Sequence, residues 1–293
     1  MNAHASEPPL REVRGPSALG GGARRFFDLL WLISVTEFKR VYFGTVLGYV
    51  WSLVRPLMLF GVLLFVFTKV FRIGSAQVEH YPSLLLLGIV LFTFFQESGT
   101  NAVGSVVNQE GVVRKTQFPR LVIPMSTVLT GAFNLSLNLI IVFGFMLAFG
   151  VQPAWTWLLF PVALAALFIL TATVCMALSV LYVRFRDVAI IWVVLGQVLF
   201  YATPILYPVT AFNEPTVQEF HGVPYEHILM INPLAVIFEQ IRVWLLTEPG
   251  APTAVQAAGG ASHLIPAALI FLATCAFGAW IFNRDAPRIA ENL

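Results

Sequence analysis

The sequence predicts an all-α membrane protein with six transmembrane helices. It also predicts an N-terminal interfacial helix, re-entrant outer helices before the last span, and both termini in the cytoplasm. Two observations support this fold class. First, 58% of the 293 residues are hydrophobic and only 11% are charged, whereas soluble domains average about 25% charged residues. Second, long apolar segments alternate with loops whose basic residues are concentrated on one side of the membrane.

Each apolar segment is long enough to cross a membrane as a helix, because a hydrocarbon core of ~30 Å needs about 20 helical residues. The segments leave no room for a separate soluble domain, so residues 25–293 are predicted to form one transmembrane domain. The predicted spans lie near residues 46–71, 83–107, 121–149, 156–182, 188–208 and 263–283.

The basic residues predict the orientation of these spans. When the gaps are assigned alternately to the two sides, one side receives only Lys69, Arg72 and Arg242 of the 17 Lys and Arg. Short loops rich in Lys and Arg stay in the cytoplasm, so both termini are expected inside. Arg55, near the inner end of the first span, is expected to snorkel to the cytoplasmic headgroups.

The N-terminal region divides into two parts. Residues 1–24 are rich in Pro, Gly and Ala with scattered charge, and they are predicted to be a disordered extension. Residues 25–44 combine large apolar side chains such as Phe27 and Trp31 with basic ones such as Arg40. This composition favours a helix that lies in the headgroup layer.

The segment 209–249 is predicted to be a re-entrant or interfacial helical hairpin on the outer side. Its apolar part, 228–246, is nearly long enough to span, but a seventh span would place the C-terminal arginines outside. Two opposite charges one turn apart would also be costly in mid-bilayer. That pair and an Asn-Pro step near the start of the stretch are Glu239, Arg242, Asn232 and Pro233.

Motifs for catalysis, metal binding or nucleotide binding are missing from the sequence. Cys175 and Cys275 lie in apolar helices, so neither a disulfide nor a metal site is inferred. No H-E-x-x-H, C-x-x-C or G-x-x-x-x-G-K-[ST] pattern occurs. If the protein uses ATP, another chain must therefore bind it. The outer segment does carry Glu214, Glu219, His221, Glu226 and His227, so a membrane enzyme acting on a lipid-linked substrate stays open as an alternative.

The inner loop between the second and third spans is short, polar and basic. It contains NQEGVVRKTQFPRLVIP at 108–124. Such a loop suits docking of a soluble subunit, but membrane topology alone would also explain its charges. Both interpretations stay open from the residues alone.

Two polar stripes run along the second and third spans. They contain Thr93, Glu97, Asn101, Ser105 and Asn108 in the second span, and Thr127, Thr130, Asn134 and Asn138 in the third. Spacings of three and four residues keep each set on one helical face. An intramembrane Glu suggests function. We favour the alternative that the stripes hydrogen-bond to each other, at ~0.6 kcal/mol per bond.

Five segments carry a family resemblance. They are EFKRVYFGTVLGYVWSLVRPL at 37–57, NQEGVVRKTQFPRLVIP at 108–124, YVRFRDV at 182–188, TPILYP at 203–208 and INPLAVIFEQIR at 231–242. In this set and order, the chain resembles the permease subunit of type-2 ABC exporters, in the group that exports polysaccharide, O-antigen and teichoic acid (polyol phosphate). The N-terminal extension departs from that pattern.

The resemblance implies an interface helix followed by six spans, with outer gate helices that include Asn232, Pro233, Glu239 and Arg242. It also implies a coupling helix in 108–119 that meets the ATPase. The expected coupling residues are Asn108, Glu110, Arg114, Lys115, Phe118 and Pro119. The family works as a permease homodimer with two nucleotide-binding ATPase subunits, which bind ATP and Mg, so no cofactor is expected on this chain.

The resemblance predicts the function as well. The expected function is that of a permease subunit, not an enzyme, in an ATP-driven exporter of a lipid-linked polysaccharide such as O-antigen, capsule, teichoic acid or a galactan-like polymer. An exporter of a drug or small lipid is the alternative within the same family. The expected location is the bacterial inner membrane, as a multi-pass protein that contacts lipids and no nucleic acid.

Aromatic side chains are candidates for the channel wall. A sliding glycan needs many weak contacts, and aromatic rings can contact the apolar C–H faces of sugars. The candidates are Trp51, Phe92, Phe95, Phe200 and Tyr201. Gly88 and Gly99 share the Phe92 and Phe95 face and are expected to leave room for a polymer. For any single Phe, packing in the bundle is the alternative.

Overall fold

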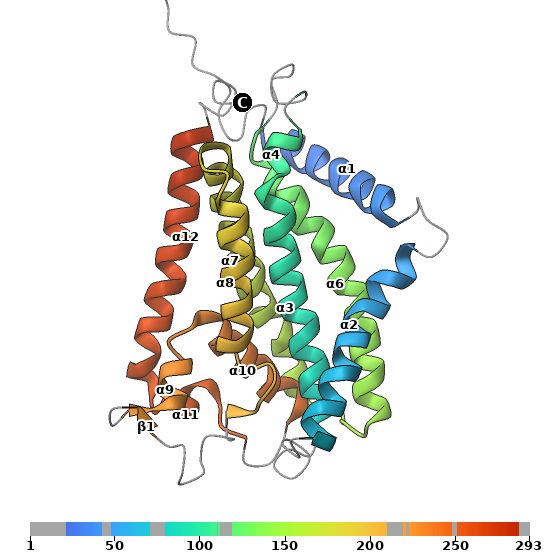
Figure 1. The fold of residues 1–293 in the computed structure, drawn as a ribbon, viewed down its shortest axis with the longest axis vertical. Coiled ribbons are helices and arrows are strands. Elements are labelled where there is room, and N and C mark those ends of the chain that lie inside the picture. The colour runs from blue at the N-terminus through green and yellow to red at the C-terminus, as the bar shows by residue number, and fades with distance from the viewer. Residues whose placement is uncertain are drawn as a thin grey trace, which may run out of the picture.

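The computed structural model describes residues 22–42, 48–70, 80–109, 111, 119–209, 219–220, 223–247 and 251–286. Long helices form a bundle, and short helices lie at its two ends (Figure 1). The long helices are α1 (Ala23–Tyr42), α2 (Gly48–Phe65), α3 (Tyr81–Val103), α6 (Val122–Ala148), α7 (Phe160–Arg184), α8 (Val188–Ala202), α10 (Pro233–Leu246) and α12 (Ile265–Asp285). The short helices are α4 (Ser105–Asn108), α9 (Tyr225–Leu229), α11 (Ala254–Ala257), the π-helical η1 (Val66–Val70) and the 3₁₀ turns η2 (Trp155–Leu159) and η4 (Ala261–Leu264).

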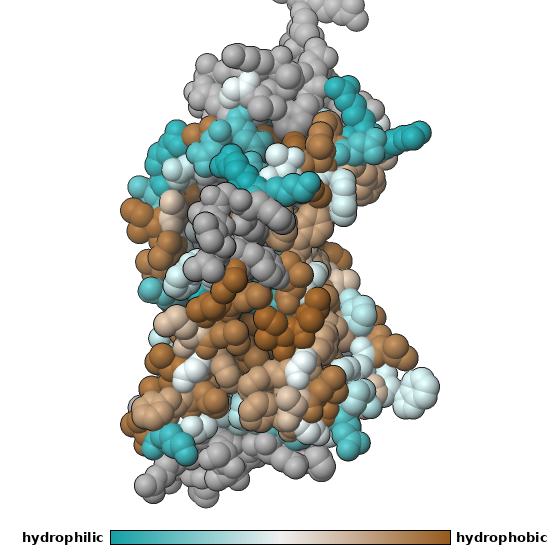
Figure 2. Space-filling view, turned by 90° about the vertical axis from the view of Figure 1, so that its right-hand side faces the viewer, coloured by the Kyte–Doolittle hydropathy of each residue, from teal (hydrophilic) through white to brown (hydrophobic). Residues whose placement is uncertain are grey.

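Five helical segments of the described chain are long and apolar enough to cross a membrane. They are Val50–Val70, Tyr81–Val103, Val122–Ala148, Trp155–Arg184 and Ala261–Asp285. They agree with five of the six predicted spans. Figure 2 shows a broad area of hydrophobic side chains over the middle and lower part of one face, with hydrophilic side chains gathered near both ends. This distribution is the one expected for a protein with a lipid-facing belt.

The fifth predicted span, 188–208, is wrong in length. Helix α8 ends at Ala202, because Thr203 takes an extended conformation (ψ 137°) before Pro204, as residues preceding proline usually do. At 1.5 Å per residue, its 15 residues reach about 22 Å. The chain then continues as a turn in which Thr203, Ile205 and Val209 are fully buried.

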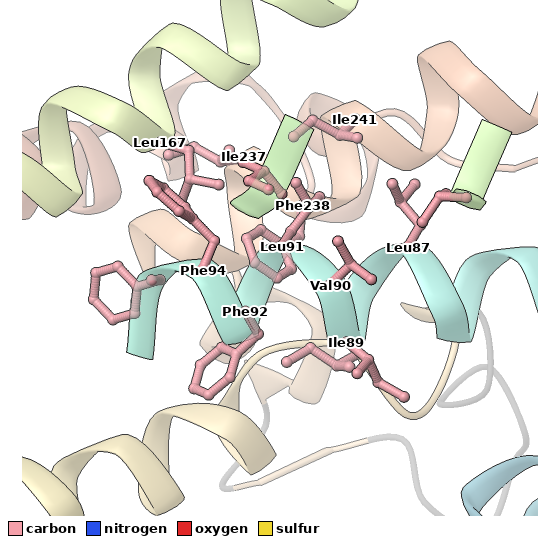
Figure 3. Packing of buried hydrophobic residues seen from close by; sticks show 14 of the residues in the cluster. Leu87, Ile89, Val90, Leu91, Phe92, Phe94, Leu167, Ile237, Phe238 and Ile241 are labelled. Atoms are coloured by element: carbon pink, nitrogen blue, oxygen red, sulfur yellow. The ribbon is translucent and has the colours of Figure 1, made fainter. Parts of the chain in front are cut away.

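Helix α3 lies at the centre of the bundle. It is contacted by helices α2, α6, α7, α8 and α10, and 78% of the residues in its apolar 18-residue stretch are buried. Figure 3 shows Leu91 and Phe94 on the side that faces Leu167 of α7 and Phe238 of α10, while Phe92 points to the opposite side. The core cluster therefore surrounds α3.

Helices α7 and α12 approach each other closely at a glycine. A Cβ atom on Gly278 of α12 would overlap the carbonyl oxygen of Thr173 on α7 and lie 2.9 Å from its carbonyl carbon. The Thr173 hydroxyl in turn lies 3.7 Å from the Cys275 sulfur. Small residues at such a crossing allow the backbones of membrane helices to touch.

Helix α1 lies obliquely at the end of the bundle where α12 ends (Figure 1). It packs on α6 through edge-on contacts of the Phe133 ring with Trp31 and Phe38, at centroid distances of 5.4 and 5.8 Å. The predicted interface helix at 25–44 is thus a helix, beginning at Ala23 instead of Arg25. Its position in the headgroup layer stays a prediction, and most of the predicted disordered extension lies outside the described residues.

The segment before α12 lies at the opposite end of the bundle (Figure 1). It contains β1 (Glu219–Phe220) and β2 (Val223–Pro224), which pair antiparallel, followed by α9, α10 and α11. This two-residue pairing leaves the predicted all-α fold class unchanged, because every other element of the described chain is helical. Helix α10 has 14 residues and reaches about 21 Å, too short for a ~30 Å core. Its length agrees with the rejection of a seventh span, and re-entrant insertion stays a prediction.

Candidate functional site

Six residues of the two polar stripes line one cavity between α2, α3 and α6, whereas Ser105, Asn108 and Thr127 do not line it. The cavity has a volume of about 610 Å³. Helix α3 contributes Thr93, Glu97 and Asn101 to its wall, and α6 contributes Thr130, Asn134 and Asn138. The spacing of three and four residues explains why each helix turns its polar groups to the same side. The stripes therefore meet in space, as two walls of one site.

The stripes do not bond directly to each other in the described part of the chain. The side-chain amide of Asn138 donates to the Asn134 carbonyl at 2.9 Å within α6. The Thr130 hydroxyl donates to the Ser34 carbonyl of α1 at 3.3 Å. The interpretation of the stripes as mutual hydrogen-bond partners is therefore wrong for these residues, whose side chains bond within α6 or to α1.

An ion pair joins α2 to α3 at the cavity. The Arg55 Nη1 lies 3.1 Å from the Glu97 Oε1, with side chains 80% and 38% exposed. Arg55 contacts Glu97, and its reach to the lipid headgroups stays a prediction. Opposite charges in consecutive spans were a sequence signal for this pair. Glu97 therefore has a charged partner, which lowers the cost of an intramembrane carboxylate.

Two further polar groups of the cavity wall were missed by the sequence analysis. The Ser98 side chain is 1% exposed, and its Oγ has no hydrogen-bond partner in the described structure. The Oε1 of Gln96 also has no hydrogen-bond partner in the described structure. Both residues line the cavity. Both atoms are buried away from the cavity surface: the Ser98 Oγ packs against Gly131 of α6, and the Gln96 amide packs against Gly196 of α8.

The aromatic candidates separate into two groups. Trp51 lines the cavity and is 60% exposed. Phe92 and Phe95 are buried and contact α8, with centroid distances of 5.2 Å from Phe92 to Phe200 and 5.6 Å from Phe95 to Trp192. These three Phe rings pack α3 against α8 within one chain. Their role in a channel wall, and that of the exposed Tyr201, stays a prediction.

The space expected beside two glycines of α3 is filled. A Cβ on Gly99 would overlap the Trp192 ring and lie 2.9 Å from its Nε1, and one on Gly88 would lie 3.1 Å from the Ile205 side chain. The expectation that Gly88 and Gly99 leave room for a polymer is therefore wrong within one chain. Helix α8 and the turn after it occupy that room.

Both termini of the predicted coupling segment lie on the side of the bundle where α12 stops (Figure 1). Asn108 is exposed at the end of α4, and Pro119 is buried. Next to Pro119, the Arg120 guanidinium donates to the Ala286 carbonyl after α12. The other expected coupling residues, Glu110, Arg114, Lys115 and Phe118, lie outside the described residues.

The expected gate residues form the start and the buried face of α10. The Asn232 side chain accepts from the Leu234 N–H at 3.0 Å and donates to the Thr203 hydroxyl at 3.1 Å. Pro233 occupies the first helical position, where its missing N–H is not needed. Glu239 and Arg242 are both buried, 3.5 Å apart. The Asn232 contacts tie α10 to the turn that follows α8.

The described residues contain no group of three His, Cys, Asp or Glu side chains that could hold a metal ion. The structure contains a cavity between apolar helices that is lined by side chains able to hydrogen-bond. This arrangement is typical of a polytopic membrane protein that handles a polar molecule within the membrane, because exposed polar groups at that depth must face water or protein.

Comparison with known proteins specifies the class. Residues 28–246 match the family model described as ABC-2 type transporter, and the chain belongs to that family. It is 31% identical over 211 residues to the O-antigen export system permease protein RfbA of Klebsiella pneumoniae, covering 71% of this chain and 76% of that one. A protein of the same name from Myxococcus xanthus is 29% identical over 200 residues, covering 68% and 72%. The chain is therefore a multi-pass permease of the bacterial inner membrane.

Proposed function

We propose that this chain is the permease subunit of an ATP-driven exporter that moves a lipid-linked polysaccharide of the O-antigen type outward across the plasma membrane. The observation that carries the proposal is the similarity to two permeases named for O-antigen export, each aligned over more than two thirds of both chains. The working unit is a homodimer of this permease with two ATPase subunits. The proposed role is transport, without covalent chemistry on the substrate.

The cavity supports a transport role. Its wall carries amides, hydroxyls and one ion pair on helices whose outward surfaces are apolar, such as the exposed Met58, Val62 and Phe65 of α2. Polar groups at this depth are tolerated where they face water or a polar ligand. A hydrated path along α2, α3 and α6 would therefore let a glycan cross beside hydrogen-bonding side chains while its lipid stays in the bilayer.

The energy source in this proposal is a separate subunit. The printed sequence holds no P-loop pattern. The loop between α4 and α6 is the proposed contact with the ATPase, since both of its ends lie at the end of the bundle that carries the basic loops. Arg120 links this loop to the end of α12, which gives a docked ATPase a mechanical connection to two spans.

Deletion of the gene in the organism of origin tests the proposal. We expect surface glycan to disappear and lipid-linked glycan to accumulate on the cytoplasmic side, with both effects reversed by the wild-type gene. As a control, an ATPase partner that cannot hydrolyse ATP should reproduce the deletion. Unchanged surface glycan together with altered resistance to small molecules would instead identify an exporter of drugs or small lipids.

A further inference from the structure

The cavity between α2, α3 and α6 has the size of a ligand site. Its volume of about 610 Å³ falls within the roughly 300–1,000 Å³ range of small-molecule pockets. Its wall carries hydroxyl and amide side chains from α3 and α6 together with the Arg55–Glu97 ion pair.

The charges of this wall balance. Among the described lining residues, Arg55 and Glu97 carry charge, and they pair with each other at 3.1 Å. An anionic ligand that binds Arg55 would lie beside the Glu97 carboxylate, 3.1 Å from the Arg55 Nη1, and juxtaposed like charges are unfavourable. The site therefore disfavours a phosphate or pyrophosphate group.

The neutral part of the wall suits hydroxyl groups. Asn101, Asn134 and Asn138 bring three side-chain amides to the wall, of which the Asn138 amide donates to the Asn134 Oδ1 at 3.1 Å. Side-chain amides carry both donors and an acceptor, which matches a hydroxyl that also donates and accepts. Trp51 and Phe94 on the same wall add apolar ring surface for C–H groups. A ring that carries hydroxyls on its edge and C–H groups on its faces meets both requirements.

We propose that this cavity binds an uncharged, hydroxyl-rich segment of the exported molecule, namely one or a few sugar rings, and leaves the anionic phosphate to another part of the complex. The proposal rests on the proposed function for the source of the sugar. Asn134 and Asn138 of α6 and Asn101 of α3 then determine specificity for neutral sugar rings. A glycerol headgroup of a phospholipid offers the same hydroxyl chemistry, so the test must distinguish the two sources.

A cysteine in the cavity gives the readout. Thr100 lines the cavity, and its hydroxyl bonds to the Gln96 carbonyl of its own helix, so Thr100→Cys is a small change. Cys175 and Cys275 are replaced by alanine in the background. The permease–ATPase complex in nanodiscs is then labelled with an uncharged thiol reagent, and Val255→Cys on the exposed surface near the outer end serves as the control site.

Two soluble probes are compared, the oligosaccharide released by mild acid from the host's lipid-linked glycan and inorganic pyrophosphate. At about ten times its Kd, a ligand leaves roughly a tenth of the sites free, so the oligosaccharide should slow labelling at Thr100→Cys about tenfold. Labelling at Val255→Cys should not change. Pyrophosphate should have no effect, and the result should be equal in phosphatidylcholine and phosphatidylglycerol nanodiscs.

A matched pair of α6 variants checks that the amides are responsible. Asn134→Ala removes a cavity amide, whereas Ser136→Ala removes an exposed hydroxyl bonded within its own helix. We expect protection to be lost in the first variant and kept in the second, with equal labelling rates in the absence of sugar. Equal rates would show that both variants keep the fold around Thr100.

Three results would overturn the inference. The first is that the oligosaccharide does not slow labelling at Thr100→Cys in complexes that transport glycan on ATP addition. The second is that pyrophosphate slows this labelling. The third is that labelling is slowed by phosphatidylglycerol alone. Failure of the proposed function is separate, because it would appear as absent ATP-driven glycan transport. Protection by the oligosaccharide in such a complex would still support a sugar site.

Discussion

The contact between α7 and α12 predicts that Gly278→Ala is destabilising. The new Cβ would lie 2.9 Å from the Thr173 carbonyl carbon, whereas carbon atoms in contact prefer about 3.5–4.0 Å. The obstructing atoms are backbone, so rotation of a side chain cannot relieve the overlap and the helices must separate. Overpacking of this kind costs roughly 1–3 kcal/mol.

The matched control is Gly144→Ala in α6, where nothing lies within 4 Å of the new Cβ. Alanine favours a helix over glycine by about 0.5–1 kcal/mol, so this variant should be as stable as wild type or more stable. Thermal unfolding in nanodiscs measures the difference. At about 2–4 °C per kcal/mol for a chain of this size class, the midpoint for Gly278→Ala should fall by roughly 2–12 °C. An unchanged or raised midpoint would refute the close approach of the two helices.

Three further predictions concern the ion pair, the coupling loop and the topology. Glu97→Gln keeps an acceptor for Arg55 and should retain most transport, while Glu97→Leu should impair folding or gating; loss of export in a well-folded Gln variant would contradict this role. Phe118→Ala should leave the permease in the membrane but lower ATPase co-purification, because buried aromatic anchors carry much of an interface's energy; unchanged co-purification and coupled hydrolysis would exclude docking there. In intact cells, impermeant reagents should label a cysteine at Val255 but not at Ala286, and external labelling at Ala286 would restore a seven-span topology.

Local features of the fold were accessible from the sequence because they depend on neighbours in the chain. The apolar segments gave the positions of five spans, and the 14-residue α10 agrees with the rejection of a seventh. The early end of α8 was also a local matter, since Thr203 precedes Pro204 and such residues avoid helical conformation. Pro204 was therefore the sequence signal for a span shorter than 188–208.

Features that depend on what lies opposite a helix face were not accessible. The spacing of Glu97 and Asn134 placed each on a polar face, but whether the two faces touch or enclose a cavity depends on how α2, α3 and α6 pack. The open space expected beside Gly99 is filled by Trp192, a residue distant in sequence. Helical periodicity determines on which face of a helix a side chain lies. Only the packed structure shows which neighbouring element occupies the space beside that face.

Transport in a purified system tests the central claim most directly. The permease and its ATPase are reconstituted into proteoliposomes with the host's lipid-linked glycan, and a glycosidase added on the side away from the ATPase reports glycan that has crossed. We predict that the digested fraction rises only with ATP and Mg, and only with a hydrolysis-competent ATPase. Equal digestion with and without ATP, by a complex that hydrolyses ATP, would contradict glycan export by this permease.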